Sequence, residues 1–198
     1  MKRMLQEYSH LAFLDIETTG RDPGSHEIIE VGIAMVDPKT RELKDTHELK
    51  IMPEHLEIAD PESLAINHFT PEAWQGALPQ QEAMQKLCGI LSGSTPCGWN
   101  VGFDRAFLET ALNRAGFTIS GCGIDYTWHD IKMDFIRWAK LVGREEEFGP
   151  RFGLRVAREA FGVSAEGAHS ALPDAMATFE VWKRLEDDFQ RIKPTLHI

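Results

Sequence analysis

Cysteine is scarce in this chain of 198 residues, and no two cysteines form a CxxC motif. The three cysteines are Cys88, Cys97 and Cys122. Their odd number and wide spacing fit neither a disulfide-rich scaffold nor a zinc-binding motif. The sequence therefore predicts a protein of a reducing compartment, and we expect it in the cytoplasm.

Long apolar runs are also missing. No stretch reaches the ~18 apolar residues of a membrane-spanning helix. The charged N-terminal segment MKRMLQEYSH is not followed by the apolar region of a secretory signal. We therefore expect no signal peptide and no membrane association. With 42% hydrophobic residues, the chain is long enough to bury one core, which predicts a single domain over residues 1–198.

Basic residues are in deficit, with 21 Lys and Arg against 31 Asp and Glu and a net charge of −10. Tight nonspecific binding to nucleic acid depends on neutralising phosphates with a basic surface. The deficit counts against such a binder. It counts less against an enzyme that uses divalent cations at the reacting phosphate and meets its substrate briefly.

The hydrophobic pattern changes from strands to helices along the chain. Short apolar or β-branched runs predict strands over 10–16, 27–36, 42–52 and 95–99, with a turn at 37–40. Helical patterns cover 61–92 (with breaks near Pro71 and Pro79), 101–115, 129–142, 154–161 and 171–189. A strand meander followed by alternating strands and helices predicts an α/β domain with a mixed sheet.

Two acidic residues, Asp15 and Glu17, end the first predicted strand. Side chains two apart on a strand point to the same face, so the two carboxylates emerge together. Paired acids beside an apolar strand repel one another and are costly to desolvate, and a cation would relieve both effects. A solvated strand end is the alternative.

A third acidic residue, Asp104, follows the fourth predicted strand and falls in the first turn of the next helix. Taken alone, its position is best explained by helix capping and by the helix dipole. Near the C-terminus, Ser170 is a candidate N-cap of the last helix, His169 lies just before it and Asp174 lies in its first turn. Either residue alone is more typical of a structural role.

Together these acids come from the end of one strand, from the next strand–helix junction and from the start of the last helix. These positions can converge at one edge of a sheet. Four carboxylates with one titratable His are typical of oxygen-ligated Mg²⁺ or Mn²⁺.

Three segments resemble the ordered motifs of the DEDD 3′–5′ exonucleases. They are residues 13–20 (FLDIETTG), 100–104 (NVGFD) and 169–174 (HSALPD). His169 lies five residues before Asp174, as in the DEDDh subgroup, whereas the DEDDy subgroup has Tyr where this chain has Ser170. The resemblance extends over about residues 10–187.

The resemblance implies a ribonuclease H-like fold, a five-stranded mixed sheet flanked by helices. It implies that Asp15, Glu17 and Asp174 bind one Mg²⁺ or Mn²⁺ ion. Asp15 would bridge to a second ion, which Asp104 reaches through water. Glu17 and His169 would be catalytic, with His169 taking a proton from the attacking water. An imidazole suits that role because it titrates near neutrality.

The resemblance also implies the substrate, which would be single-stranded DNA or RNA with a free 3′ end. It would be cleaved to 5′-mononucleotides. The backbone around Thr18 and Thr19 would receive the terminal nucleotide. A basic stretch between Lys132 and Arg158 fits a polyanion, because Arg151, Arg155 and Arg158 recur at helical spacing. A solvated face in which Arg155 pairs with Glu159 is the alternative.

Two other functions compete with an exonuclease. One is a non-catalytic module with this fold that binds protein, as a homodimer or as the partner of a polymerase. The complete set of acids and His169 argues against it, and release of mononucleotides from a labelled oligonucleotide would discriminate. The other is a sugar-phosphate or glycoside hydrolase with a carboxylate pair, which leaves the three ordered motifs unexplained.

Overall fold

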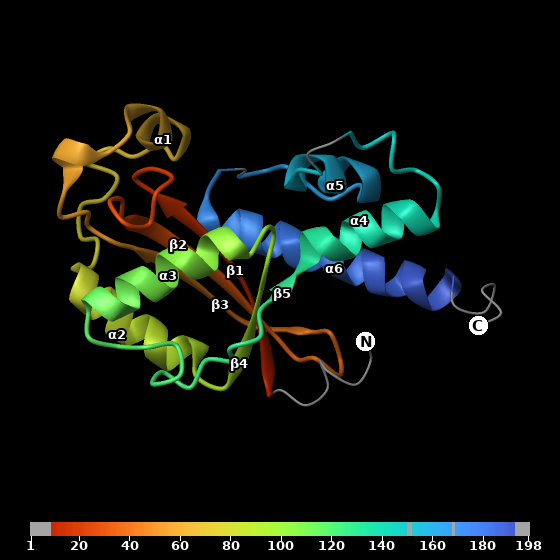
Figure 1. Ribbon diagram of the computed structural model, residues 1–198, viewed down its shortest axis with the longest axis horizontal. Coiled ribbons are helices and arrows are strands. Elements are labelled where there is room, and N and C mark those ends of the chain that lie inside the picture. The colour runs from red at the N-terminus through yellow and green to blue at the C-terminus, as the bar shows by residue number, and fades with distance from the viewer. Residues whose placement is uncertain (1–8, 150–151, 168, 193–198) are drawn as a thin grey trace.

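Residues 10–50 form an antiparallel meander of three strands. The computed structural model describes residues 9–149, 152–167 and 169–192. In it β1 (His10–Thr18) pairs with β2 (Ile28–Val36), and β2 pairs with β3 (Leu43–Lys50), both antiparallel (Figure 1). All three strands were predicted, although β1 continues two residues further than its apolar run.

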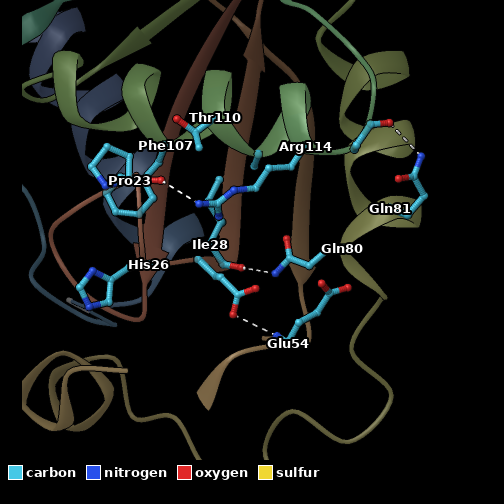
Figure 2. Close-up of a pocket in the computed structure, with 12 residues that line it drawn as sticks. Pro23, His26, Ile28, Glu54, Gln80, Gln81, Phe107, Thr110 and Arg114 are labelled. Carbon is cyan, nitrogen blue, oxygen red and sulfur yellow. Dashed lines mark hydrogen bonds between the residues drawn. The ribbon is translucent and has the colours of Figure 1, made fainter. Parts of the chain in front are cut away.

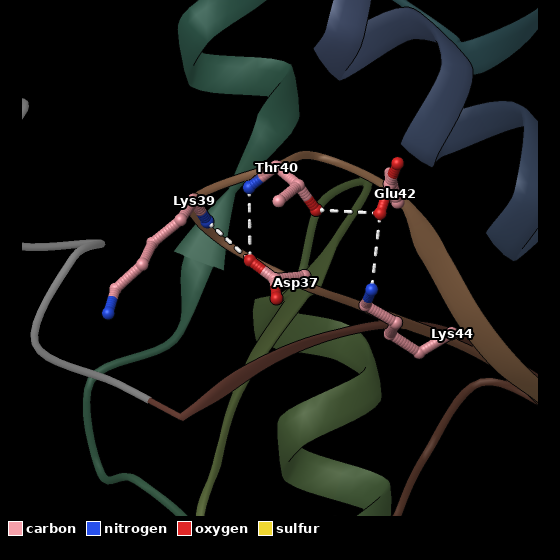
Figure 3. A network of polar contacts seen from close by, with 5 residues as sticks. All are labelled: Asp37, Lys39, Thr40, Glu42 and Lys44. Atoms are coloured by element: carbon pink, nitrogen blue, oxygen red, sulfur yellow. Dashed lines mark hydrogen bonds and ion pairs between the residues drawn. The ribbon is translucent and has the colours of Figure 1, made fainter.

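The predicted turn at residues 37–40 joins β2 to β3 and is closed by a polar network (Figure 3). The Asp37 carboxylate accepts hydrogen bonds from the amides of Lys39, at 2.8 Å, and Thr40, at 3.0 Å. The Thr40 hydroxyl and the Lys44 ammonium each reach the Glu42 carboxylate at 3.2 Å. Asp favours such turns because its side chain bonds to the backbone two residues on.

Two parallel strands complete the sheet. β4 (Ser94–Gly98) lies beside β1, and β5 (His129–Asp130) lies beside β4, which gives the order β3-β2-β1-β4-β5. The expected five-stranded mixed sheet is confirmed. The prediction of a helix starting at His129 is wrong, because residues 129 and 130 pair with β4. Asp130 then caps helix α4 (Ile131–Leu141) by accepting the Lys132 amide.

Helices cover both faces of the sheet (Figure 1). The remaining ones are a short 3₁₀ turn η1 (Leu56–Ile58), α1 (Pro61–Ile66), α2 (Gln80–Leu91), α3 (Gly102–Arg114), α5 (Leu154–Phe161) and α6 (Ala171–Ile192). The helical pattern over 61–92 is split into α1 and α2, as the prolines predicted. In the part of the chain that the structure describes, no helix combines the length and apolar character needed to cross a bilayer.

Alternation along β1 decides where its acidic end points. Leu11 and Phe13 belong to the core built with α4, α5 and α6, whereas Leu14 belongs to the core built with α2 and α3. Because side chains two apart share a face, Asp15 and Glu17 continue the face of Leu11 and Phe13. They therefore face the layer that contains α6.

The start of α6 lies directly on the backbone of β2. Gly32 pairs with Asp15 across the β1–β2 ladder. A Cβ at Gly32 would collide with backbone atoms of Ala171 and Leu172, in the first turn of α6. A glycine is needed here because the two backbones approach too closely for a side chain.

The sequence analysis identified no disulfide pair, but the structure contains one. Cys88, on α2, is bonded to Cys122, in the segment after α3, and their Cα atoms are 4.8 Å apart. Cys97 is free and buried in β4. The sequence did not predict this pairing, because the two cysteines are 34 residues apart. Helix α2 and the segment after α3 become neighbours only in the folded chain.

Candidate active site

Three of the predicted carboxylates meet where β1 ends and α6 begins. One carboxylate oxygen from each of three residues lies within 4.8 Å of the other two; the residues are Asp15, Glu17 and Asp174. All three side chains are partly buried. Three carboxylate oxygens this close can be shared by one hard divalent cation. The predicted convergence of strand end and helix start is therefore present.

Asp104 completes the cluster from the other helical layer. It is the third residue of α3, whose N-cap Val101 makes no side-chain hydrogen bond, and it is only 3% exposed. Burial raises the pKa of Asp104 to about 7. Hydrogen bonds from the backbone of Asp104 itself and of Ile16 lower this pKa, but they do not outweigh the burial. Its negative charge also raises the pKa of Asp15, so the two carboxylates interact.

The cluster holds its protons unusually tightly. Burial, and then the charges of Asp104, Glu17 and Asp174, raise the pKa of Asp15 well above its ordinary value. Burial, followed by the charges of Asp174, Glu30 and Asp104, raises the pKa of Glu17 to about 8. Buried carboxylates that lie close together respond in this way, and the charge of Arg158 offsets only part of the effect on Asp15. A cation bound among them would reverse the effect.

These raised pKa values predict that the metal-free protein loses stability as pH rises. Glu17, with a pKa of about 8 when folded and about 4.3 when unfolded, binds more protons in the folded state between these values. Its contribution is therefore complete below pH ~4 and is lost as pH rises through 8. Urea unfolding in EDTA should give a lower free energy of unfolding at pH 8 than at pH 5.5.

Glu17→Gln is the control for this pH dependence, because an amide cannot titrate. The variant should show a flatter dependence than the natural protein. Equal stability of the natural protein at the two pH values would contradict the prediction.

Glu30 is a fifth carboxylate beside the cluster, and it was not predicted. It pairs with Glu17 across the β1–β2 ladder and is only 2% exposed. Burial, and then a hydrogen bond and charge interaction with Glu48, raises its pKa to about 7. An acid inside the otherwise apolar run IIEVGIAMV was the available signal.

Ser170 and His169 form the turn into α6. The Ser170 hydroxyl donates to Glu30 Oε1 at 3.3 Å, and the Ser170 carbonyl accepts the Asp174 amide at 3.1 Å. His169 is exposed and has a φ of 67°, in the left-handed region. Its amide donates to Asp174 Oδ2 at 3.2 Å. His169 is therefore tied through its backbone to a carboxylate of the cluster.

Thr18 and Thr19 begin the loop that follows β1. The Thr18 hydroxyl donates to the Gly20 carbonyl at 2.6 Å, and the Asn67 side chain donates to the Thr18 carbonyl at 2.9 Å. Thr19 exchanges hydrogen bonds with Glu27, through its amide and its hydroxyl, each at 2.9 Å. These bonds give the loop next to the cluster a fixed shape.

The far side of this loop borders a pocket of about 120 Å³ between the loop and helices α2 and α3 (Figure 2). Arg114, on α3, donates to the Gly24 carbonyl at 2.6 Å. Gln80, on α2, donates to the Ile28 carbonyl at 3.2 Å. The Glu27 carboxylate accepts the Glu54 amide at 3.0 Å. The Arg114 bond ties the loop to α3, the Gln80 bond ties α2 to β2, and the Glu27 bond ties the end of the loop to the segment after β3.

Of the arginines with helical spacing, the two that the structure describes do not form one exposed basic surface. Arg158 is only 5% exposed, and its Nη2 lies 2.8 Å from Asp174 Oδ1. Arg155 is exposed and pairs with Glu159 at 2.7 Å, as the alternative predicted, and Arg151 lies outside the described residues. The helical spacing of the arginines was visible in the sequence. The packing of the start of α6 against Arg158 was not.

Gly32→Ala should disturb the cluster through the backbone. The added methyl group would push the start of α6 away from β2, and with it Asp174. Overpacking of this kind costs about 1–3 kcal/mol, measurable by urea unfolding. Gly89→Ala, at an open position on α2, is the control and should be neutral or stabilising. Unchanged stability of Gly32→Ala would show that α6 can shift freely.

Comparison with known proteins assigns the family. Residues 12–182 match the RNase T family model, which is described as an exonuclease family. The chain belongs to this exonuclease family. Hydrolysis of ester bonds is the chemistry that membership implies, and the matched range contains all the predicted site residues.

The relatives of this chain include both a DNA polymerase and an oligoribonuclease. It is 27% identical to a PolC-type DNA polymerase III of Thermotoga petrophila, over 94% of this chain but 12% of the polymerase. It is 23% identical to an oligoribonuclease of Aromatoleum aromaticum, over 96% of this chain and the full length of that protein. The chain thus spans about an eighth of the polymerase.

Solved structures show the same fold. A zinc-bound complex of E. coli exonuclease I with single-stranded DNA aligns with a TM-score of 0.80 at 19% identity, over 96% of this chain and 43% of that chain. Another exonuclease I structure aligns with a TM-score of 0.77 at 20% identity, over 93% and 44%. The ribonuclease H-like fold that the motifs implied is confirmed.

Proposed function

We propose that this chain is a metal-dependent 3′–5′ exonuclease of the DEDDh subgroup, which releases 5′-mononucleotides from DNA or RNA. The observation that carries the proposal is the approach of Asp15, Glu17 and Asp174 to within 4.8 Å in a chain of an exonuclease family. His169, five residues before Asp174, supports the DEDDh assignment.

The cluster fits divalent cations. Its donors are all carboxylate oxygens, the set that Mg²⁺ and Mn²⁺ prefer. Burial and mutual repulsion raise the pKa values of Asp15 and Glu17, as expected for buried acids that lie close together. Asp15, Glu17 and Asp174 would hold one ion, and Asp15 and Asp104 a second.

The protein groups then have separate tasks. When bound, two such ions activate a water molecule and stabilise charge on the leaving oxygen. His169 accepts the proton of the attacking water as general base. The hydrogen bond from its backbone amide to the Asp174 carboxylate keeps it beside the cluster. The internally bonded loop at Thr18 and Thr19 receives the terminal nucleotide and orients the scissile bond.

The substrate in this proposal is single-stranded nucleic acid with a free 3′ end. The fold match to an exonuclease I complex with single-stranded DNA supports a single strand. The relatedness to both a DNA polymerase and an oligoribonuclease supports either sugar. Parallel digestion of DNA, RNA and dinucleotides with Mn²⁺ would rank the three.

Direction of attack is the test of the proposal. A linear single strand labelled at its 5′ end should shorten stepwise and release 5′-mononucleotides. A covalently closed circle of the same sequence, or a strand with a blocked 3′ terminus, should resist, because neither offers a free 3′ end. Cutting of the circle at a comparable rate would identify an endonuclease instead.

A module without activity is the competing proposal, favoured by the alignment with a segment of a DNA polymerase. It predicts no hydrolysis of any of these substrates and a homodimer or a polymerase partner in solution. A single domain over residues 1–198 and a cytoplasmic location stay predictions under either proposal.

A further inference from the structure

A buried arginine lies against the carboxylate cluster. Arg158, on α5, has a side chain that is 6% exposed, and its Nη2 lies 2.8 Å from Asp174 Oδ1. The same nitrogen lies 3.3 Å from the Pro173 carbonyl, in the first turn of α6. A buried guanidinium is unfavourable without a counter-charge, so the cluster and Arg158 stabilise one another.

The contact with Asp174 is close but poorly aligned. Asp174 Oδ1 and Arg158 Nε are both buried without a hydrogen-bond partner among the described residues, although Nη2 and Oδ1 form an ion pair. Charge attraction, more than an aligned hydrogen bond, therefore dominates the pair. Such attraction depends on the total charge around Asp174, which a metal ion would change.

The positive charge also reaches Asp15. Arg158 lowers the pKa of Asp15, in opposition to burial and three neighbouring carboxylates. One fixed positive charge thus acts on two of the three residues that would share a cation. Any cation bound there is repelled by the same guanidinium.

We propose that Arg158 is a positioning residue that holds Asp174 in the metal-free protein and weakens the binding of divalent cations to the cluster. This inference rests on the proposed metal site. Arg158 neutralises one carboxylate when no cation is present, and the cation competes with it for Asp174. The site should therefore release its cation more readily than the four carboxylates alone would.

Binding of Mn²⁺ to the protein alone, measured by calorimetry, tests this without reference to catalysis. Arg158→Met removes the charge and keeps an apolar side chain of similar length. Its Kd for Mn²⁺ should fall at least about tenfold, because a unit charge and a divalent ion about 6 Å apart repel one another by that much even in water, and by more where they are buried. Arg158→Lys, which keeps the charge, should stay close to the natural protein.

The direction of the change separates this role from a purely structural one. Loss of a residue that only shaped the site would weaken Mn²⁺ binding, whereas loss of a competing charge tightens it. The melting temperature gives a second readout, since metal-free Arg158→Met should melt lower than the natural protein and gain more from Mn²⁺. Arg155→Met, at an exposed position on the same helix, is the matched control and should change neither.

Every outcome bears on the proposal. If Arg158→Met does not fold, Arg158→Gln replaces it, because its amide removes the charge and can still donate to Asp174. Unchanged or weaker Mn²⁺ binding in a folded variant overturns the proposal, as does failure of both variants to fold in Mn²⁺. A natural protein that binds no Mn²⁺ overturns the proposed function itself, which distinguishes the two failures.

Discussion

Asp15→Asn should lower the rate of nucleotide release by at least ~10³. Asp15 lies at the centre of the cluster, since Asp104, Glu17 and Asp174 all act on its pKa. An amide removes one charge from both proposed cation positions. Cations of this kind supply several kcal/mol of transition-state stabilisation, and each ~1.4 kcal/mol lost is a tenfold loss in rate.

Binding and turnover should fail together in this variant. Calorimetry should show weaker Mn²⁺ binding for Asp15→Asn and for Asp174→Asn, because each removes a negative charge from the proposed cation site. EDTA should abolish the activity of the natural protein, and Mg²⁺ or Mn²⁺ should restore it. Ca²⁺ is larger and its geometry looser, so it should bind without restoring the full rate.

Asp45→Asn is the control for the acidic variants. Asp45 is an exposed acid on β3 that pairs with His47 at 3.5 Å, away from the start of α6. Its loss should leave both metal binding and rate unchanged. Full activity of the natural protein after exhaustive chelation, or of Asp15→Asn with Mn²⁺, would rule out the two-ion mechanism.

His169→Ala should lower the rate by ~10²–10⁴, the usual contribution of a positioned acid–base group. Unlike the acidic variants, it should bind Mn²⁺ with nearly unchanged affinity, because the three clustered oxygens come from Asp15, Glu17 and Asp174. The backbone amide of residue 169 still donates to Asp174 after this substitution. A loss of rate without loss of metal is therefore the expected signature.

His47→Ala, on β3, is the matched control and should keep the natural rate. The pH profile is less decisive than this comparison, because metal-bound water titrates in the same range as an imidazole. A His169→Ala protein with a near-natural rate would show that the cation alone activates the water. His169 would then be a structural residue of the turn into α6.

Local sequence patterns predicted most of the elements and the cluster. The run HLAFLDI and the acids that end it have strand periodicity, and HSALPD has the signals of a helix start. Each motif also lies at the end of its element, so their meeting at one sheet edge followed from the order of the elements. Side-chain alternation was enough to put Asp15 and Glu17 on one face.

Features that depend on contacts between distant segments were not predictable in this way. The two-residue strand β5 carries no periodicity, and only the pairing of His129 with Cys97 and of Asp130 with Gly98 defines it. Arg158 has the same local pattern whether it faces solvent or Asp174. The pairing of Cys88 with Cys122 depends on the packing of α2 beside the segment after α3.

Glu30 lies between these two cases. Its place in an apolar strand was visible, but its neighbours Glu17 and Ser170 come from other elements. A single acid in such a run indicates only that some polar group lies beside its carboxylate. The strand register was needed to identify the partner.

The alternation along β1 has a consequence for how the site persists. Asp15 and Glu17 face the layer of α4, α5 and α6, whereas Asp104 is supplied by α3 from the opposite layer. The four acids therefore come from two helical layers on opposite faces of the sheet. Opening of either core would separate Asp15 from Asp174 or from Asp104, so cations held as proposed would stabilise both cores together.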